Sequence, residues 1–217
     1  VGNRQRVLVS DLAGRSNIFY KLKEHGLEEK LNEESRKVLL EKIKQMEFEG
    51  YELEAAEGTF ELMVRQALNP GKDFFQVVSF DVTTKMGRSG GSLTMATLSL
   101  QAKDGLHTET AVGNGPVNAL DEALRKALVE FYPEVAHVKL MDYKVRVIDS
   151  KKGTAAKVRV LIEWSDQKRS WATVGVSDNV IEASWKALVD AIRLELMRLA
   201  DGDDAIEKAV EDYCWGV

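Results

Sequence analysis

Residues 91–100 (GSLTMATLSL) and residues 153–162 (GTAAKVRVLI) decide the fold, because they are the aligned centres of an internal repeat. Each stretch begins with a glycine and a hydroxyl residue and continues with apolar residues at alternate positions, which is the period of a β-strand. The same offset pairs Ala96 with Val158, Leu98 with Val160, Leu100 with Ile162, and Val112-Gly113 with Val174-Gly175. One residue less of offset pairs Asp81-Val82 with Asp142-Tyr143.

Each copy predicts the order strand, glycine-containing loop, strand, turn, strand and helix. Neither short sheet covers its apolar face alone, so the copies are expected to pack together. The sequence therefore predicts an α+β domain of two βββα units in a pseudo-two-fold arrangement, with chance similarity of the copies as the alternative. In the first strand, alternation predicts one face with Phe75, Val77, Ser79 and Asp81, and another with Gln76, Val78, Phe80 and Val82. Further strands are predicted at 93–100 and 158–162, and helices at 116–131 and 178–199.

The first third of the chain has helical periodicity instead, which predicts a helical linker subdomain over residues 1–70. Helices are expected at 16–31, from Asn32 to about Gly50, and at 54–68. The second helix is expected to bury Val38, Leu39, Ile43 and Met46. Asn69-Pro70-Gly71 marks the boundary, residues 71–199 form the βββα domain, and residues 200–217 form an acidic tail.

Composition limits the possible partners. The net charge of −5 argues against a nucleic-acid partner, which needs a basic face. No apolar run approaches the roughly 18 residues that span a bilayer, so no membrane partner is expected. The lone Cys214, placed in a loose tail, favours a reducing, cytoplasmic setting. Because the sequence starts at Val1, we expect it to be cut from a longer protein.

Residues for catalysis are largely missing. His25, His107 and His137 lie in different segments, and none has a second His or Cys at metal-ligand spacing. No phosphate loop or dinucleotide motif is present. We therefore predict no catalytic residue, no metal site and no cofactor in this chain.

Two stretches stand out as candidate binding elements. In residues 113–119 (GNGPVNA), Pro116 suits the first position of a helix, which leaves the N–H groups of Val117 and Asn118 free to bind a carboxylate. The alternative is a tight turn with a helix cap. In residues 140–147 (LMDYKVRV), alternation puts Met141, Tyr143, Val145 and Val147 on one strand face. Tyr143 is then either a core residue or the wall of a pocket.

These two stretches, with 153–156 (GTAA), resemble the C-terminal region of the α-isopropylmalate synthase and citramalate synthase family. Residues 9–17 (VSDLAGRSN) resemble the segment that follows the catalytic barrel there, and residues 173–185 are most similar to the citramalate-type branch.

The resemblance implies a parent enzyme that condenses acetyl-CoA with a 2-oxo acid, pyruvate in citramalate synthases. That reaction takes place in a TIM barrel with a divalent metal, which this chain lacks. It also implies a homodimer, whose interface we expect to bury about 2,000 Å² or more, and feedback inhibition by an end-product amino acid. Isoleucine is favoured as the effector. By resemblance, its binding residues are Gly115, Val117, Asn118, Leu140, Tyr143, Val147 and Thr154.

Three alternatives remain open. The chain could belong to a leucine-regulated isopropylmalate synthase. It could be a purely structural dimerisation module without a working ligand site. It could also be a complete small enzyme, against which the missing catalytic residues argue.

Overall fold

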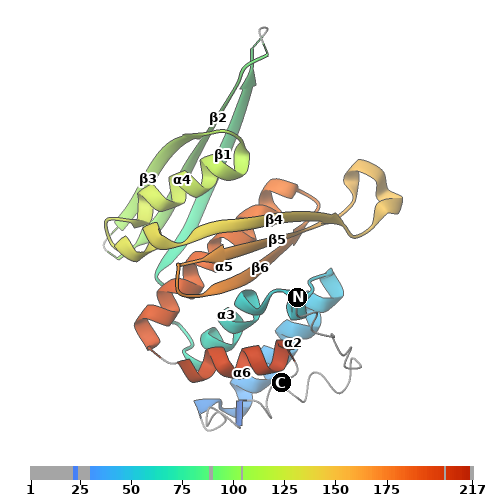
Figure 1. Cartoon of the computed structure of the whole chain (residues 1–217), viewed down its shortest axis with the longest axis vertical. Coiled ribbons are helices and arrows are strands. Elements are labelled where there is room, and N and C mark those ends of the chain that lie inside the picture. The colour runs from blue at the N-terminus through green and yellow to red at the C-terminus, as the bar shows by residue number, and fades with distance from the viewer. Residues whose placement is uncertain (1–21, 24–29, 88–89, 104, 203, 216–217) are drawn as a thin grey trace.

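A computed structural model describes residues 22–23, 30–87, 90–103, 105–202 and 204–215 of the 217-residue chain. It contains two three-stranded antiparallel sheets, each followed by a long helix (Figure 1). Unit one consists of β1 (Phe75–Met86), β2 (Ser92–Ala102), β3 (Gly105–Gly113) and α4 (Pro116–Leu128). Unit two consists of β4 (Lys139–Val147), β5 (Val158–Ser165), β6 (Ser170–Ser177) and α5 (Val180–Asp201). The predicted α+β fold of two βββα units is confirmed.

Equivalent glycines lie at the end of the third strand in each unit. A Cβ on Gly113 would lie 2.4 Å from the backbone nitrogen of Ala119, and a Cβ on Gly175 would lie 1.9 Å from the carbonyl oxygen of Ala183. Both contacts are closer than any side chain tolerates. The following helix can therefore cross the strand only where a glycine stands, which explains the repeated Val-Gly step.

The strand register corrects one part of the repeat. Gly113 pairs with Thr94, and Gly175 pairs with Val160, so Thr94 is the counterpart of Val160. Leu98 lies in the strand that corresponds to that of Val160, as predicted, but its own counterpart is Trp164, four residues further on. The shift is an even number of residues, so every side chain still points to the same face. On this alignment Val82 and Tyr143 are counterparts, as the sequence predicted.

A β-bulge between Val77 and Ser79 overturns the predicted faces of the first strand. The extra residue, Val78, reverses the alternation that follows. Phe75 and Val77 therefore share the core side with Phe80 and Val82, instead of opposing them.

The helical segment forms as predicted where the structure describes it. α2 (Glu33–Glu49) begins at Asn32, whose side-chain Oδ1 accepts a hydrogen bond from the Ser35 N–H at 2.7 Å. It ends at Gly50 in the left-handed conformation, with φ of 102°. Val38 is exposed, contrary to the prediction, whereas Leu39 and Ile43 are buried. The expected first helix and residues 9–17 lie largely outside the described residues.

A second helix, α3 (Glu57–Leu68), follows the 3₁₀ turn η2 (Leu53–Ala55) and covers the edge of unit two. Edge strands carry unpaired backbone groups that need partners. Thr59 Oγ1 accepts from the Val174 N–H at 3.0 Å, and Glu57 Oε1 accepts from the Ala172 N–H at 3.1 Å. Side chains of α3 therefore close the free edge of β6.

The C-terminal segment is a helix, α6 (Asp204–Trp215), and not the loose tail that the sequence suggested. Ile206, Ala209 and Val210 recur at helical spacing and are buried in a core shared with α2 and α3. Cys214 packs against the same core, and burial raises the pKa of its thiol.

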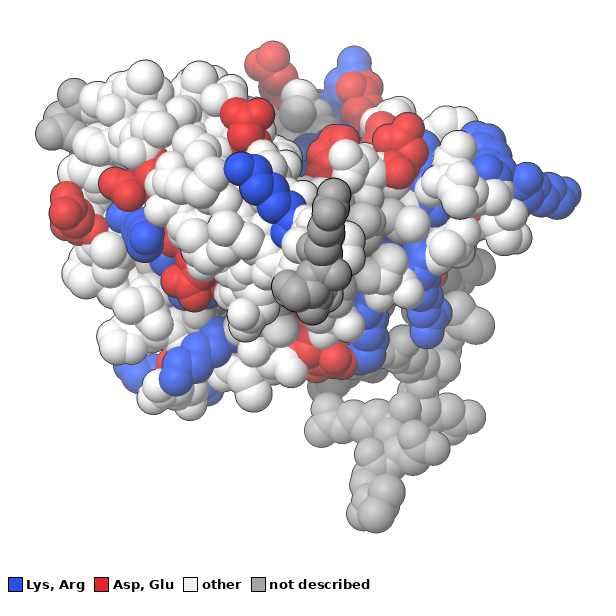
Figure 2. Space-filling model, turned by 90° about the horizontal axis from the view of Figure 1, so that it is seen from above, with Lys and Arg blue, Asp and Glu red and all other residues white. Residues whose placement is uncertain are grey.

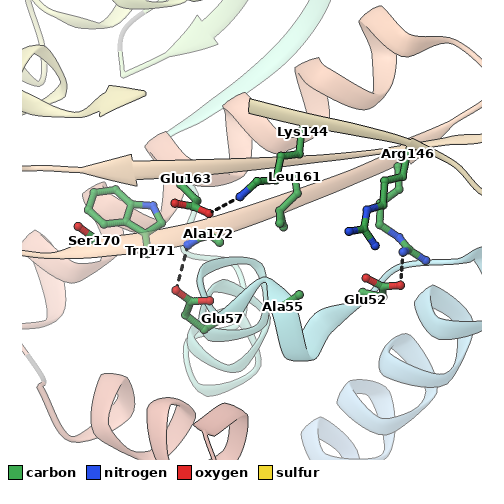
Figure 3. Close-up of a pocket in the computed structure, with 11 residues that line it drawn as sticks. Glu52, Ala55, Glu57, Lys144, Arg146, Leu161, Glu163, Ser170, Trp171 and Ala172 are labelled. Carbon is green, nitrogen blue, oxygen red and sulfur yellow. Dashed lines mark hydrogen bonds and ion pairs between the residues drawn. The ribbon is translucent and has the colours of Figure 1, made fainter. Parts of the chain in front are cut away.

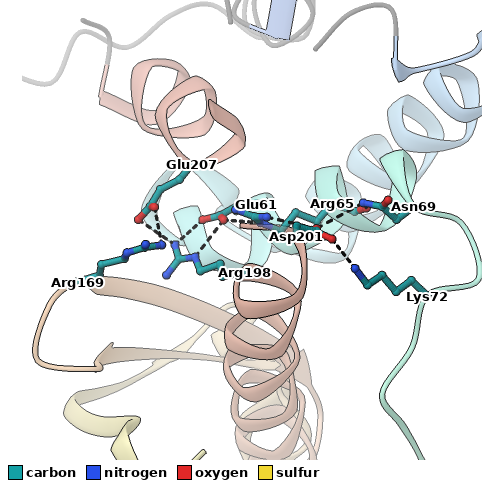
Figure 4. Close-up of polar contacts among 8 residues, drawn as sticks. All are labelled: Glu61, Arg65, Asn69, Lys72, Arg169, Arg198, Asp201 and Glu207. Atoms are coloured by element: carbon teal, nitrogen blue, oxygen red, sulfur yellow. Dashed lines mark hydrogen bonds and ion pairs between the residues drawn. The ribbon is translucent and has the colours of Figure 1, made fainter. Parts of the chain in front are cut away.

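A network of charged side chains joins these helices to unit two (Figure 4). The buried Glu61 of α3 accepts from Arg65 Nε at 2.6 Å and from Arg198 Nε of α5 at 3.0 Å. Arg198 also reaches Glu207 of α6 at 3.5 Å. Breaking a buried pair leaves an uncompensated charge, so the network fixes how the three helices meet.

Candidate functional site

The start of α4 offers free backbone donors. Gly115 stands before Pro116 in an extended conformation and has no side chain to cap the helix. Among the described residues, no side chain accepts from the N–H groups of Val117 or Asn118. Such an end attracts anions through its donors and the helix dipole together.

The two side chains at this helix start, those of Asn118 and Val117, make different contacts. Asn118 is exposed, and its Oδ1 accepts from the Asn114 N–H at 3.0 Å, which shapes the preceding loop. Val117 is partly buried and packs against the large core of the two units. The tight turn of the second alternative is therefore present, but its helix cap is not, because no side chain among the described residues caps the start of α4.

A second bulge, between Leu140 and Asp142, arranges the predicted residues of β4. Leu140 pairs with Trp164, and Tyr143 pairs with Ile162, both of which are buried. Paired residues point to the same side of a sheet, so Leu140 and Tyr143 share one face. Val147, paired with Val158, lies on this face too.

Met141 does not join that face, contrary to the simple alternation. It is the extra residue of the bulge and is 64% exposed. Because the bulge adds one residue to the strand, Leu140, which precedes it, points to the same side of the sheet as Tyr143.

Tyr143 lies at the border of the core. Its hydroxyl is 2.7 Å from Ser184 Oγ, and Ser184 in turn donates to the Val180 carbonyl in the first turn of α5. The ring therefore bridges β4 and the start of α5, and one side of it packs on the core.

Thr154 is exposed in the 3₁₀ segment η4 (Ser150–Ala155), next to Gly153 with φ of 58°. The structure thus groups Gly115, Val117 and Asn118 at one helix start, and Leu140, Tyr143 and Val147 on one strand face. No hydrogen bond among the described residues joins the two groups. They belong to different units.

A cavity of about 510 Å³ lies on the opposite face of the unit-two sheet, against η2 and α3 (Figure 3). Sequence reasoning missed it because its residues come from five separate elements, η2, α3, β4, β5 and β6. The available signal was the charged residues at alternate positions of β4 and β5.

Its charges largely neutralise one another. Lys144 contacts Glu163 at 3.0 Å, and Arg159 pairs with Glu52. Burial raises the pKa of Glu57. The buried Trp171 Nε1 has no partner among the described atoms.

The surface seen from above the β1–β2 hairpin is mostly uncharged, with basic and acidic residues interspersed (Figure 2). Among the described residues, no group of three or more His, Cys, Asp or Glu side chains could hold a metal ion. No helix in the described part of the chain is long and apolar enough to cross a membrane.

Comparison with known proteins identifies relatives. Residues 54–195 match the model of the LeuA allosteric (dimerisation) domain. The chain is 49% identical over 199 residues to an (R)-citramalate synthase of Aquifex aeolicus, covering 91% of this chain and 38% of that protein. It is 47% identical to an (R)-citramalate synthase of Geobacter sulfurreducens, covering 90% of this chain and 37% of that protein. A 2-isopropylmalate synthase of Aquifex aeolicus is 28% identical, with 89% of this chain and 34% of that protein covered. The chain thus spans somewhat over a third of the length of these curated relatives.

Proposed function

The chain belongs to the LeuA allosteric (dimerisation) domain family, and we propose that it binds an end-product amino acid and pairs with a second copy to regulate a citramalate synthase-type enzyme. Isoleucine is the favoured effector. The observation that carries the proposal is the uncapped start of α4, because it supplies unpaired donors beside the apolar side chain of Val117.

The proposed site lies between the start of α4 and the Leu140–Val147 strand face. The effector carboxylate accepts from the N–H groups of Val117 and Asn118, where the helix dipole favours negative charge. Its aliphatic side chain packs against Leu140, Tyr143 and Val147, where each buried methylene contributes about 0.8 kcal/mol. Thr154 lies in the loop that we propose closes the site.

Calorimetry of the chain with isoleucine, leucine and valine tests the effector. We expect isoleucine to bind most tightly, although one branch changes affinity by only about 1–3 kcal/mol. Tighter binding of leucine would favour the isopropylmalate synthase alternative. Binding of none of the three would favour a purely structural dimerisation module.

We propose that two copies pair through the open face of the unit-one sheet. α4 covers one side of this sheet, and the other side carries Leu93, Met95, Leu106 and Val112, which are 41–61% exposed. The long β1–β2 hairpin extends this face away from the rest of the molecule (Figure 1). Leu93, Met95 and Val112 lie together on this face, and the exposed hydroxyl pairs Thr97–Thr110 and Ser99–Thr108 separate them from Leu106. Exposed apolar side chains that lie together mark interaction surfaces.

Val112→Lys tests this interface, with Val38→Lys as its matched control. The two valines are similarly exposed, at 59% and 57%, but Val38 lies on α2, away from the sheet. Light scattering should give a dimer for the parent chain and for Val38→Lys, and a monomer for Val112→Lys. A dimer that survives Val112→Lys would place the interface elsewhere.

We propose that the whole protein condenses acetyl-CoA with pyruvate in a barrel that holds a divalent metal. This rests on its similarity to (R)-citramalate synthases. The 217-residue chain alone should show no such turnover. Metal-dependent condensation by the purified chain would contradict the assignment of catalysis to another part of the protein.

A further inference from the structure

A second cavity, of about 410 Å³, lies where the helical segment meets both βββα units. Its walls come from α2, α3, α5 and β1. Six apolar side chains line it: Met46, Leu62, Met63, Val77, Trp185 and Val189. Its volume lies in the range of small-molecule sites, about 300–1,000 Å³, and such sites combine apolar walls with a few polar groups.

One carboxylate faces this cavity without an ion-pair partner. The only hydrogen bond to Asp190 among the described residues comes from Thr59 Oγ1, at 3.4 Å. Burial raises the pKa of Asp190 to about 6, although the cations of Arg193 and Lys42 act against that rise. No basic nitrogen among the described residues lies within salt-bridge distance of Asp190. The carboxylate thus lacks a close positive partner.

Two basic side chains that line the same cavity, Lys42 and Arg193, have N–H groups that make no hydrogen bond among the described residues. The Arg193 guanidinium donates to the Phe75 carbonyl at 3.2 Å and pairs with Asp73 at 3.4 Å through Nη2, but its Nε is buried and has no partner among the described atoms. Lys42 is exposed at the rim, and the one hydrogen bond of its ammonium among the described residues goes to Gln66 Oε1, at 3.2 Å. Loss of hydration lowers the pKa of Lys42. Neither donor is neutralised by Asp190 through direct contact.

This pattern differs from that of the cavity in Figure 3. There Lys144 contacts Glu163, and Arg159 contacts Glu52, so most charges are satisfied within the protein. Charges of both signs that face one cavity without touching are costly, because each has lost part of its hydration. A ligand that carries both charges would satisfy them together.

We propose that this cavity binds a free α-amino acid with an apolar side chain. Its ammonium group donates to the Asp190 carboxylate, and its carboxylate accepts from Lys42 and Arg193 Nε. Its side chain lies against Trp185 and the neighbouring apolar wall.

This site is separate from the one at the start of α4, and the argument for it depends on the charged groups of Asp190, Lys42 and Arg193. It shares no lining residue with Val117 or with the Leu140–Val147 face. Its occupant would touch α2 and α3 on one side and α5 and β1 on the other. Binding there would therefore stiffen the junction between the helical segment and the two units.

The test uses leucine and two analogues that each lack one charge, 4-methylpentanoate and 3-methylbutylamine. Trp185 lines the cavity, so the fluorescence of the 217-residue chain reports on occupancy. We expect leucine to change this fluorescence with saturation, and each analogue to bind at least about tenfold more weakly. Trp185→Phe should remove the response and so assign it to this cavity.

Two variants probe the charges. Lys42→Gln and Asp190→Asn should each weaken leucine binding about tenfold or more, while Lys44→Gln, an exposed neighbour on α2, leaves it unchanged. A response equally strong with 4-methylpentanoate, or unaffected by Asp190→Asn, would overturn the proposal. So would no response to leucine, which would mean that the cavity does not bind an amino acid.

Val117→Phe distinguishes this site from the one at α4. It fills the α4 site without adding an indole, so the Trp185 response to leucine should persist. If Val117→Phe abolishes the response, the cavity is not an independent site. If the response persists while isoleucine shows no binding at the α4 site, the proposed effector site fails and the cavity stands.

Discussion

The two βββα units follow the same order along the chain, but their surroundings differ. In unit two, α5 covers one face of the sheet, and Leu161 and Val174 on the other face pack against the helical core. Its helix begins at Asn179, whose side chain accepts from the Ile181 N–H at 2.9 Å. In unit one, α4 covers one face and the other is open, and the helix begins at Gly115 without a cap.

This difference indicates where each unit needs something from outside the chain. Unit two satisfies the edge of β6, the sheet face beneath α3 and its helix start with residues of its own chain, and only β4 keeps apolar side chains such as Leu140 and Val147 exposed among the described strands of this unit. Unit one leaves apolar side chains exposed on its open face and backbone donors free at its helix start. An apolar partner surface suits the first feature, and an anion suits the second. Unit one therefore offers the open sheet face and the uncapped helix start, while unit two offers the exposed face of β4.

The largest expected effect on stability concerns the equivalent glycines of the two units, Gly113 and Gly175. Gly175→Ala should lower the free energy of unfolding by about 3 kcal/mol, because its Cβ would lie 1.9 Å from the Ala183 carbonyl oxygen. Gly113→Ala should cost about 2 kcal/mol, because its closest contact is longer, at 2.4 Å. Urea denaturation measures both.

Gly91→Ala is the control for these substitutions, since a Cβ there meets nothing within 4 Å. Its stability should match that of the parent chain. Equal, small effects at Gly113 and Gly175 would show that the helices do not press on the strands, and the structural equivalence of the units would lose its support.

A comparable effect follows from Asp190 on α5, whose carboxylate has lost much of its hydration. In the folded chain the pKa of Asp190 is raised from 3.8 to about 6. Between these values the folded chain binds more protons than the unfolded chain, so this group lowers stability as pH rises through about 4 to 6. Asp190→Asn should therefore be more stable than the parent chain at pH 7.5, by about 3 kcal/mol, and similar to it near pH 4.

Urea denaturation of the parent chain and of Asp190→Asn, at pH 7.5 and near pH 4, measures this difference in stability. Groups that titrate in both chains contribute equally to both and cancel in the difference. Lys42, Lys186, Arg193 and Tyr51 also line this cavity. The ordinary pKa values of lysine and tyrosine side chains are about 10, well above this range. A stability difference that does not vary with pH would show that Asp190 is well solvated.

The smallest effects test the helix starts directly. Asn179→Ala removes a cap and should cost about 1 kcal/mol. Gly115→Asn gives unit one the cap that unit two has, and should add a few tenths of a kcal/mol while weakening isoleucine binding. Thermal unfolding and calorimetry measure the two results. Unchanged isoleucine affinity in Gly115→Asn would mean that the donors at this helix start do not hold the carboxylate.

Much of this comparison could be predicted from the sequence. Glycines at the third strands and alternating apolar residues predicted the two units, because close helix crossing and strand pairing each leave a residue-level pattern. The helix that starts at Asn32 and ends at Gly50 was predicted from its capping residues for the same reason.

Other features leave no such pattern. The bulges at Val78 and Met141 depend on strand pairing, and one extra residue reverses the faces of the residues beyond it. The four-residue shift between β2 and β5 keeps the alternation intact, so periodicity cannot detect it. The cavity at Asp190 combines side chains from four elements, and their meeting depends on tertiary packing. The choice of effector remains a prediction.

The central claim is that the open start of α4 binds the effector, and calorimetry of isoleucine with Val117→Trp tests it most directly. The indole should fill the space beside the free N–H groups and leave the dimer intact by light scattering. We predict that the number of isoleucine sites per chain falls by one relative to the parent chain. An unchanged number of sites with unchanged affinity would contradict the account.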